Sequence, residues 1–156
     1  MTFLKPRADD QARLDLWAFD TDTGEQRLLV DSKILEPDEV ELSEEEKALR
    51  ERKRIAGSRG IVSYDWDSKG EAILVPLGGD LHLIDLTGET PTPRQLTATD
   101  AFEYDAKVSP GGGYVGFIRD GALHAIDVST GEEKRLTPKA DPEAAISYGV
   151  AEFVAQ

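Results

Sequence analysis

Short runs of alternating apolar and polar residues recur along the chain, separated by turns rich in Asp, Thr and Gly. Three of these runs align with one another: LDLWAFDTDTGEQRLLV at 14–30, DLHLIDLTGETPTPRQLT at 80–97 and ALHAIDVSTGEEKRLT at 122–137. Each begins with an apolar run that ends in Asp, continues through Thr-Gly-Glu and closes on a second run. Alternation with a period of two predicts strands with one buried face. Asp and Thr before Gly predict tight hairpin turns.

A further pair of predicted strands precedes two of these repeats. Residues 62–80 read VSYDWDSKGEAILVPLGGD, residues 104–121 read YDAKVSPGGGYVGFIRDG, and only TFLKPR precedes the first copy. Pro and Gly in the turns supply the backbone angles that tight turns require. Each complete unit therefore has four short strands over about 42 residues, the size of a β-propeller blade. The predicted fold is all-β: about three β-propeller blades of four antiparallel strands, with one inserted charged helix.

This pattern divides the 156 residues into five segments. We expect an incomplete blade at 1–31, a helical insert at 32–60, blades at 61–99 and 102–138, and the start of a further segment at 145–156. Propellers close with about four to eight blades. The chain is therefore expected to be a partial propeller, a fragment that cannot close by itself.

The insert contains the sequence SEEEKALRERKRIAG at 43–57. Ser43 and Glu46 have the spacing of a capping box, and Gly57 lies where a C-cap is expected, so a helix is predicted from about 43 to 55. Its apolar positions are few, namely Leu42, Leu49 and Ile55. We expect thin packing on the propeller and, for that reason, a candidate mobile element.

Composition narrows the classes of partner. The net charge is −13, and acidic residues are spread along the whole chain, so a nucleic-acid partner is not expected. The basic run RERKR at 50–54 follows EEE at 44–46, which is typical of a solvated helix with internal ion pairs. There is no cysteine, no apolar run of about 20 residues that could span a membrane, and no recognisable signal peptide.

The two histidines are expected to be structural. His82 and His124 occupy the same place in two repeats, three residues before the final Asp, and Trp17 takes this place in the first repeat. A position fixed by the repeat indicates an ordinary strand residue more than a base or metal ligand. Trp17 and Trp66 are interpreted as core residues, and no metal site is predicted.

Motifs for catalysis are also missing from the sequence. Ser58 in AGSRG lacks the first glycine of a nucleophile elbow. The glycines at 111–113 open a predicted strand and not a helix, so they are interpreted as hairpin residues and not as a phosphate loop. Glu132 and Glu133 lie in a predicted turn and are expected to be solvated. No catalytic residue and no cofactor are predicted for this chain.

Three stretches resemble one family. They are LDLWAFDTDTGEQRLLVDS, SEEEKALRERKRIAGSRGIVSYDWDSKGEAILVPLGGDLHLIDL and the final YGVAEFVAQ. They are similar to the N-terminal propeller of dipeptidyl peptidase IV enzymes, especially the bacterial ones and the dipeptidyl peptidase 8/9 branch. The resemblance implies a serine exopeptidase in which a propeller joins an α/β-hydrolase domain and dipeptides with Pro or Ala second are removed from peptide N-termini. It also implies that a pair of glutamates, and later a Ser/Asp/His triad, would follow Gln156.

The resemblance implies one substrate contact within the chain. In the family an arginine before the Ser-Tyr-Asp strand reaches the carbonyl region of the substrate, and the matching residue here is Arg54, ten residues before Tyr64. Arginine suits this role because its planar fork donates two hydrogen bonds to one acceptor group. Arg50 and Arg52 are the runners-up. The alternative is an exposed helical arginine paired with glutamates one turn away.

Two functions follow from these patterns. The first is the propeller portion of a dipeptidyl peptidase, itself non-catalytic, whose partners are the peptide substrate, the remaining propeller and the hydrolase domain. The second is a stand-alone binding or scaffolding module that forms a homo-oligomer through its open blade edges. The resemblance implies a periplasmic location, and the residues themselves leave the cytoplasm open.

Overall fold

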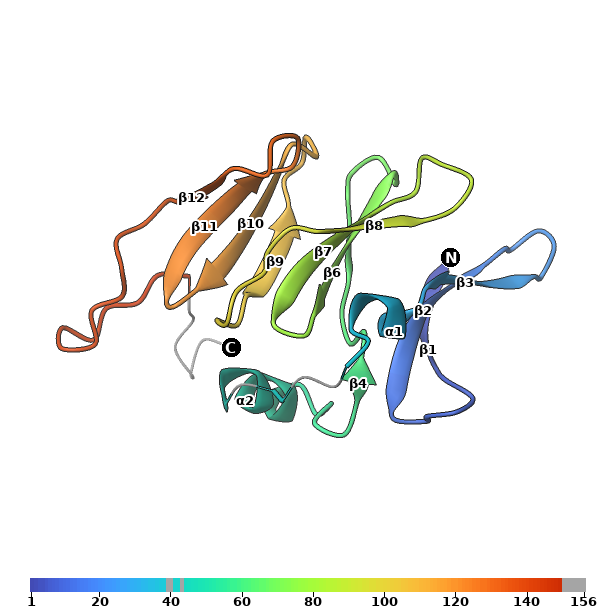
Figure 1. Ribbon diagram of the computed structural model, residues 1–156, viewed down its shortest axis with the longest axis horizontal. Helices are drawn as coiled ribbons and strands as arrows, with labels where there is room; N and C mark the ends of the chain where they lie inside the picture. The colour runs from blue at the N-terminus through green and yellow to red at the C-terminus, as the bar shows by residue number, and fades with distance from the viewer. Residues whose placement is uncertain (39–40, 43, 150–156) are drawn as a thin grey trace.

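The computed structural model describes residues 1–38, 41–42 and 44–149 and contains three separate sheets of mainly antiparallel strands that lie side by side (Figure 1). Blade 1 contains β1 (Thr2–Pro6), β2 (Arg13–Phe19) and β3 (Gln26–Val30). Blade 2 contains β5 (Asp65–Trp66), β6 (Ala72–Leu77), β7 (Asp80–Asp85) and β8 (Thr92–Gln95). Blade 3 contains β9 (Tyr104–Val108), β10 (Tyr114–Arg119), β11 (Ala122–Asp127) and β12 (Glu133–Arg135). The prediction of an all-β fold built from four-stranded propeller blades is confirmed.

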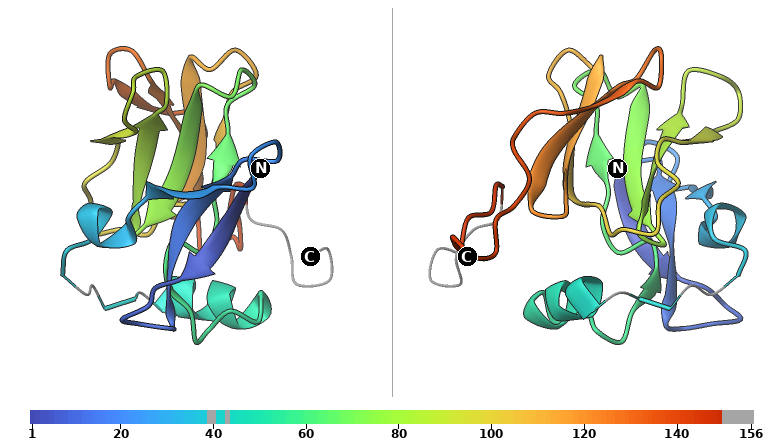
Figure 2. Two further views of the ribbon diagram at one scale, coloured as in Figure 1. Left: turned by 90° about the vertical axis from the view of Figure 1, so that its right-hand side faces the viewer. Right: turned by 60° about the vertical axis from the view of Figure 1, so that its left-hand side comes forward.

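The connection between blades 1 and 2 holds the remaining elements. It contains α1 (Ser32–Leu35), α2 (Glu44–Arg52) and β4 (Arg59–Gly60), and β4 pairs in parallel with the start of β2. Figure 2 shows α2 at one end of the molecule, beyond the ends of the blade strands. Ser43 lies outside the described residues, so the predicted capping box is not part of this description.

The predicted C-terminus of this helix is wrong. The helix ends at Arg52, and the residue in the left-handed conformation is Arg54, with φ of 57°, and not Gly57. The N–H of Ile55 donates to the carbonyl of Arg50 at 2.9 Å, and the N–H of Arg54 donates to that of Glu51 at 2.9 Å. These two bonds form a Schellman motif, which closes the helix three residues before the expected glycine.

Tight turns set the register of the blades. Gly78 and Gly79 join β6 to β7 with φ of 67° and 88°, and Asp120 and Gly121 join β10 to β11 with φ of 51° and 64°. Two-residue loops with both φ values positive match the twist of the paired strands. In the longer hairpins the final Asp of each repeat accepts backbone bonds, as Asp127 does from Ser129 N at 2.8 Å. The segments that contain Asp, Thr and Gly therefore form the tight hairpin turns that were predicted from the sequence.

The core consists of two clusters, one at each blade interface. Leu16 of blade 1 packs with Ile73 and Val75 of blade 2, whereas Leu74 of blade 2 packs with Phe117 of blade 3. All five of these residues have no exposed surface. Successive residues of β6 point to opposite faces, so the middle blade contributes to both clusters. Among the described residues, no helix is long and apolar enough to cross a membrane.

The prediction that Trp17 and Trp66 are core residues is wrong. Trp66 is 37% exposed, and Trp17 is only half-buried on the outer face of blade 1, where Lys5 lies over its ring at 4.3 Å. Trp17 pairs with Phe3 across the strands, and both lie on the face turned away from blade 2. No described blade covers this face, which is why a residue at a core position of the repeat is accessible here.

Candidate functional site

A cleft of about 130 Å³ lies where α2 meets the inner strands of blades 2 and 3. Figure 1 shows α2 beneath the ends of these blades. The lining comes from the helix and the turn after it, from the segment that enters β5, from the β6–β7 hairpin and from the segment that enters β9. These residues are Glu46, Arg50, Lys53, Ile55, Val62–Asp65, Pro76, Leu77, Gly79, Asp80 and Phe102–Lys107. The cleft thus collects the insert, the Ser-Tyr-Asp segment and two blades at one place.

The three candidate arginines occupy different environments. Arg50 lines the cleft and is only 4% exposed, whereas Arg52 and Arg54 are exposed. Arg54 follows α2 in the left-handed conformation, and its side chain makes no hydrogen bond to another described residue. A left-handed non-glycine residue is uncommon, and at Arg54 this conformation closes the Schellman motif that ends α2.

Arg50 is held by three hydrogen bonds. Its Nε and Nη2 atoms both donate to Oε1 of Glu46, at 2.9 and 2.5 Å, and its Nη1 donates to the carbonyl of Ser58 at 2.6 Å. Glu46 is likewise buried, at 7% exposure. The Glu46–Arg50 ion pair lies within α2, and the bond from Arg50 to the Ser58 carbonyl ties the helix to the segment that leads into β4. With its donors so engaged, Arg50 has a structural role in this state.

A buried carboxylate lies on the opposite wall. Both Glu103 oxygens accept hydrogen bonds: Oε2 from Thr97 Oγ1 at 2.9 Å, and Oε1 from Thr99 Oγ1 at 2.6 Å and Arg119 Nη1 at 3.1 Å. Glu103 is 1% exposed, and burial raises its pKa above the ordinary 4.5 although the three donors oppose the shift. Sequence reasoning missed Glu103. The repeat could have indicated that Glu103 is buried. When blades 2 and 3 are aligned without gaps so that Ala106 matches Tyr64, Glu103 matches Ile61, which is fully buried.

A β-bulge changes the direction of the backbone between β9 and β10, close to Glu103. The register between β9 and β10 shifts between Gly116 and Ile118, and Asp105 of β9 has φ of 51°. Bulges change the direction of nearby side chains and are common next to active sites. Asp105 lines the cleft together with the aromatic rings of Phe102 and Tyr104, which stack at 5.6 Å. Sequence reasoning had assigned no role to these three residues.

The histidines lie in strands, away from this cleft. His82 is buried, and burial lowers its pKa below 6.5. Nδ1 of His124 lies 2.8 Å from Oε1 of Glu133, and the ring of His124 stacks on Phe117 at 5.4 Å. Glu133, expected to be only solvated, also pairs with Arg119. Within the described parts of the chain, no three acidic or histidine side chains gather as a metal site would require.

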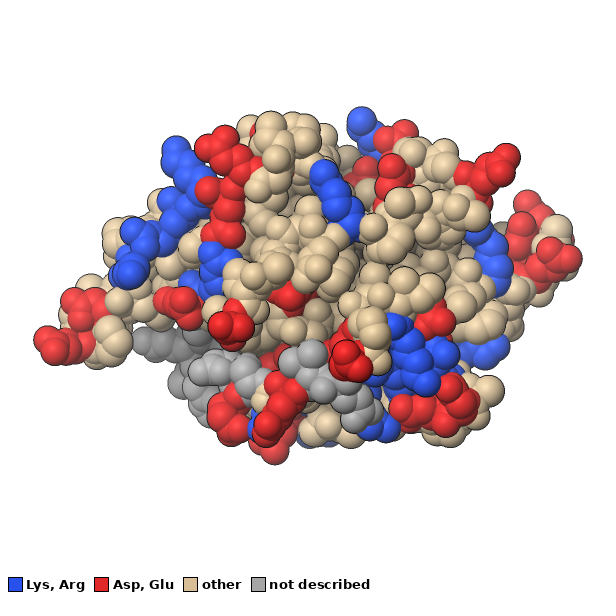
Figure 3. Space-filling view, viewed as in Figure 1, with Lys and Arg blue, Asp and Glu red and all other residues tan. Residues whose placement is uncertain are grey.

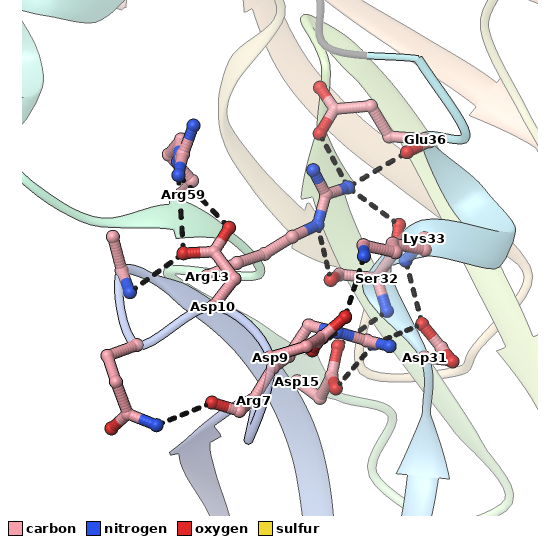
Figure 4. A network of polar contacts seen from close by, with 12 residues as sticks. Arg7, Asp9, Asp10, Arg13, Asp15, Asp31, Ser32, Lys33, Glu36 and Arg59 are labelled. Carbon is pink, nitrogen blue, oxygen red and sulfur yellow. Dashed lines mark hydrogen bonds and ion pairs between the residues drawn. The ribbon is translucent and has the colours of Figure 1, made fainter.

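A second polar network fixes the insert to blade 1 (Figure 4). Arg13, 3% exposed, donates from Nε to Ser32 Oγ at 2.9 Å and from Nη2 to the Glu36 carbonyl at 2.8 Å and to Glu36 Oε2 at 3.0 Å. Asp15 accepts from Ser32 N at 2.8 Å. Burial raises the pKa of Glu36, although Arg13 opposes the shift. We call these residues, Arg13, Asp15, Ser32 and Glu36, the Arg13 network. They place the start of the insert against the sheet.

The charges at the surface are mixed. Figure 3 shows acidic and basic side chains interspersed over the face that it presents. The cleft follows the same rule, with Lys53 and Lys107 near Asp65 and Asp80. Lys107 Nζ lies 3.9 Å from Asp65 Oδ1. Charges of both signs in one cleft can form ion pairs and hydrogen bonds with ligand groups of either sign.

The sequence model of the dipeptidyl peptidase IV (DPP IV) N-terminal region matches residues 67–156, more than half of the chain. The chain belongs to this family. The match begins just after β5 and takes in the other three strands of blade 2 and the whole of blade 3, whereas α2 and the three candidate arginines precede it. Membership in the DPP IV N-terminal region family therefore rests on β6–β12 and the residues that follow them.

A solved structure shares the fold. It is that of a putative TolB from Agrobacterium tumefaciens, which has a TM-score of 0.53 and 15% sequence identity. The alignment covers 88% of this chain and 44% of that one. At this identity the likeness shows the fold alone. The chain spans less than half the length of this structure.

Proposed function

We propose that this chain is the N-terminal propeller portion of a DPP IV-like serine exopeptidase that removes Xaa-Pro and Xaa-Ala dipeptides from peptide N-termini. The observation that carries the proposal is the match of the DPP IV N-terminal region across residues 67–156. In this function the chain positions the substrate and controls its access, and chemistry belongs to a hydrolase domain. We extend the proposal to a periplasmic location, which fractionation of the source cells would test.

Within that function, Arg54 is the proposed substrate contact. Two observations support Arg54 over Arg50, whereas Arg52 is exposed as Arg54 is. The guanidinium of Arg50 is engaged by Glu46 and Ser58, so it would have to leave a buried pair to reach a ligand. Arg54 has an exposed side chain at the left-handed position that closes α2. Its neighbours Lys53 and Ile55 line the cleft.

The test uses the complete enzyme and an Xaa-Pro p-nitroanilide substrate. Arg54→Ala is expected to lower kcat/KM by about tenfold to a hundredfold, the effect of removing a hydrogen bond from a charged donor. Arg52→Ala is the matched control, because it removes an exposed arginine from the same helix end. Unchanged kinetics for Arg54→Ala would remove Arg54 from the site, and complete enzyme without dipeptidase activity would refute the proposed function.

The isolated 156 residues should have no turnover. The described residues contain neither a paired Ser-His nucleophile nor the glutamate pair that the resemblance implies. The assay is p-nitroanilide release by the purified chain, with a mock purification from the same host to exclude contaminating peptidase. Turnover that co-purifies with the chain and exceeds that of the mock purification would contradict the proposal that the chemistry belongs to a separate hydrolase domain.

A second function is a stand-alone module that assembles as an oligomer. The observation in its favour is the apolar surface on the two outer faces, where Leu28 is 42% exposed on blade 1 and Tyr114 and Leu136 are 54% and 53% exposed on blade 3. Sedimentation velocity of the isolated chain over a range of concentrations decides this point. A stable oligomer that lacks peptidase activity even with the hydrolase domain present would favour the module.

A further inference from the structure

One threonine hydroxyl lies between two carboxylates in the wall of the cleft. Thr97 Oγ1 lies 2.9 Å from Oε2 of Glu103 and 3.3 Å from Oδ1 of Asp80. It also accepts from the backbone N–H of Leu81 at 2.8 Å. A hydroxyl has one hydrogen to donate and two lone pairs with which to accept. The hydrogen of Thr97 can therefore point directly at only one of the two carboxylates at a time.

A proton on Glu103 Oε2 would satisfy the hydroxyl and both carboxyl groups. Glu103 would then donate to Thr97 Oγ1, and the Thr97 hydroxyl would donate to Asp80. Thr97 Oγ1 would accept twice, from the backbone and from Glu103, and donate once, which is the full capacity of a hydroxyl. Oε2 has room for this proton because it is the other oxygen, Oε1, that accepts from Thr99 Oγ1 and Arg119 Nη1.

The surroundings place this proton on Glu103 and not on Asp80. Glu103 is 1% exposed, and its pKa is raised by burial and by the nearby charge of Asp80. Asp80 is only half-buried, and its oxygens accept from Gln95 Nε2 at 3.0 Å and from the N–H of Thr99 at 3.1 Å. Such donors suit an ionised carboxylate. Where two carboxyl groups share one site, one of them holds its proton more tightly.

The neighbouring cation is shared among several acidic groups. Arg119 contacts Glu103 and also pairs with Glu133, whose Oε1 lies 2.8 Å from Nδ1 of His124. One guanidinium thus faces Glu103, Glu133 and, one hydroxyl further away, Asp80. The proton on Glu103 would reduce this excess of negative charge. The other charged residues that line the cleft are Glu46, Arg50, Lys53, Asp65, Asp105 and Lys107.

We propose that Glu103 and Asp80 form a proton-sharing pair in the cleft wall, in which Glu103 Oε2 holds the proton and donates to Thr97, and Thr97 donates to Asp80. When Glu103 loses this proton, the Thr97 hydroxyl turns back to the nearer Glu103 oxygen. The pair carries one negative charge in the first state, on the more accessible Asp80, and two in the second. A ligand with a cationic group beside Asp80 would favour the second state and release the proton.

The test follows the side-chain carboxyl carbon of Glu103 by NMR while the pH of the 156-residue chain is changed. It needs no peptidase activity, so its outcome is independent of the proposed function. Thr97→Val removes the hydroxyl and keeps the shape of the side chain. The protonated pair then loses two hydrogen bonds and the ionised pair loses one, so the acid dissociation constant of Glu103 should rise by about threefold to tenfold. Thr97→Ser keeps the hydroxyl and should leave this constant close to the wild-type value.

Two results would overturn the proposal. A fall in the acid dissociation constant of Glu103 in Thr97→Val would show that Thr97 serves only as a donor to the ionised Glu103. An unchanged constant would show that the hydroxyl does not belong to the pair. If Thr97→Val fails to fold, the three-bond coupling between the hydroxyl proton and Hβ of Thr97 in wild type decides. A change of this coupling at the midpoint of the Glu103 titration supports rotation of the hydroxyl between the two carboxyl groups, and a constant coupling refutes it.

Discussion

Replacement of Gly60 by alanine tests how the insert is attached to blade 1. Gly60 belongs to β4 and has φ of 70°. A Cβ atom there would lie 2.5 Å from the Leu14 carbonyl oxygen, 2.9 Å from Arg13 Cγ and 3.0 Å from Ser32 Oγ. The first of these atoms is backbone and already accepts from Ile61 N at 3.0 Å. The substitution therefore has to move either β4 or the Arg13 network.

Two effects add to give the expected magnitude. An L-residue in the left-handed region loses about 1–2 kcal/mol. Displacing β4 from β2 loses at least one backbone hydrogen bond, worth about 0.5–1.5 kcal/mol net. We expect Gly60→Ala to lower the free energy of unfolding by about 1.5–3.5 kcal/mol. Because Ile61 follows directly and leads to the cleft segment at 62–65, the displacement should also reach the cleft.

The assay is urea unfolding followed by far-UV circular dichroism, with Gly70→Ala as the matched control. Gly70 has a nearly identical φ of 73°, and its added Cβ would meet nothing within 4 Å. Gly70→Ala should therefore show the conformational effect alone, about 1–2 kcal/mol. Equal destabilisation by the two variants would refute the reasoning, because the close contacts at Gly60 would then contribute nothing.

Three further predictions concern charged groups. Arg50→Ala should lower the free energy of unfolding by about 3–5 kcal/mol because Glu46 loses a buried partner. Arg54→Ala should change it by no more than about 0.5 kcal/mol in the same urea assay because Arg54 is exposed. Similar losses for the two variants would contradict the structural role given to Arg50. The raised pKa of Glu103 means that the folded state binds its proton more tightly than the unfolded state does. Wild type should therefore lose stability relative to Glu103→Gln as pH rises above about 4.5. An equal difference in the free energy of unfolding between the two proteins at pH 4.5 and pH 7, measured with urea, would contradict this. Hydrogen bonds from Ser129 and Thr130 lower the pKa of Asp127 below 3.8, so thermal scans should show wild type more stable than Asp127→Ala near neutral pH, with the gap closing as pH falls below that value; a gap that persists in acid would exclude the carboxylate as its source.

The blades could be predicted from the sequence because their determinants are local. Strand alternation has a period of two, and each hairpin contains its own Asp, Gly or Pro. Positions such as Asp120 and Gly121 fix a two-residue loop without help from distant residues. The order of strands within each blade then follows from sequential hairpins.

The insert could not be predicted in detail because its determinants are distant. Strand β4 has only two residues and pairs in parallel with Arg13 and Leu14, more than forty positions earlier. No periodicity can be read from so short a strand. Arg13 itself is charged and would be assigned to the surface, yet Ser32 and Glu36 satisfy its donors in the interior.

The site was predictable only in part for the same reason. The sequence located the arginine-rich helix and the Ser-Tyr-Asp segment, which do meet at one cleft. It could not distinguish the buried Arg50 from the exposed Arg54, since both belong to one basic run. The role of Arg54 stays a prediction.

Strand β6 packs on both apolar clusters, and this has an evolutionary consequence. Leu74 and Val75 are covalent neighbours, yet they belong to different apolar clusters. A change of volume at Leu74 should therefore be compensated near Phe117, and a change at Val75 should be compensated near Leu16. Across related sequences, these pairs separated by tens of residues should vary together, while the adjacent residues Leu74 and Val75 drift independently.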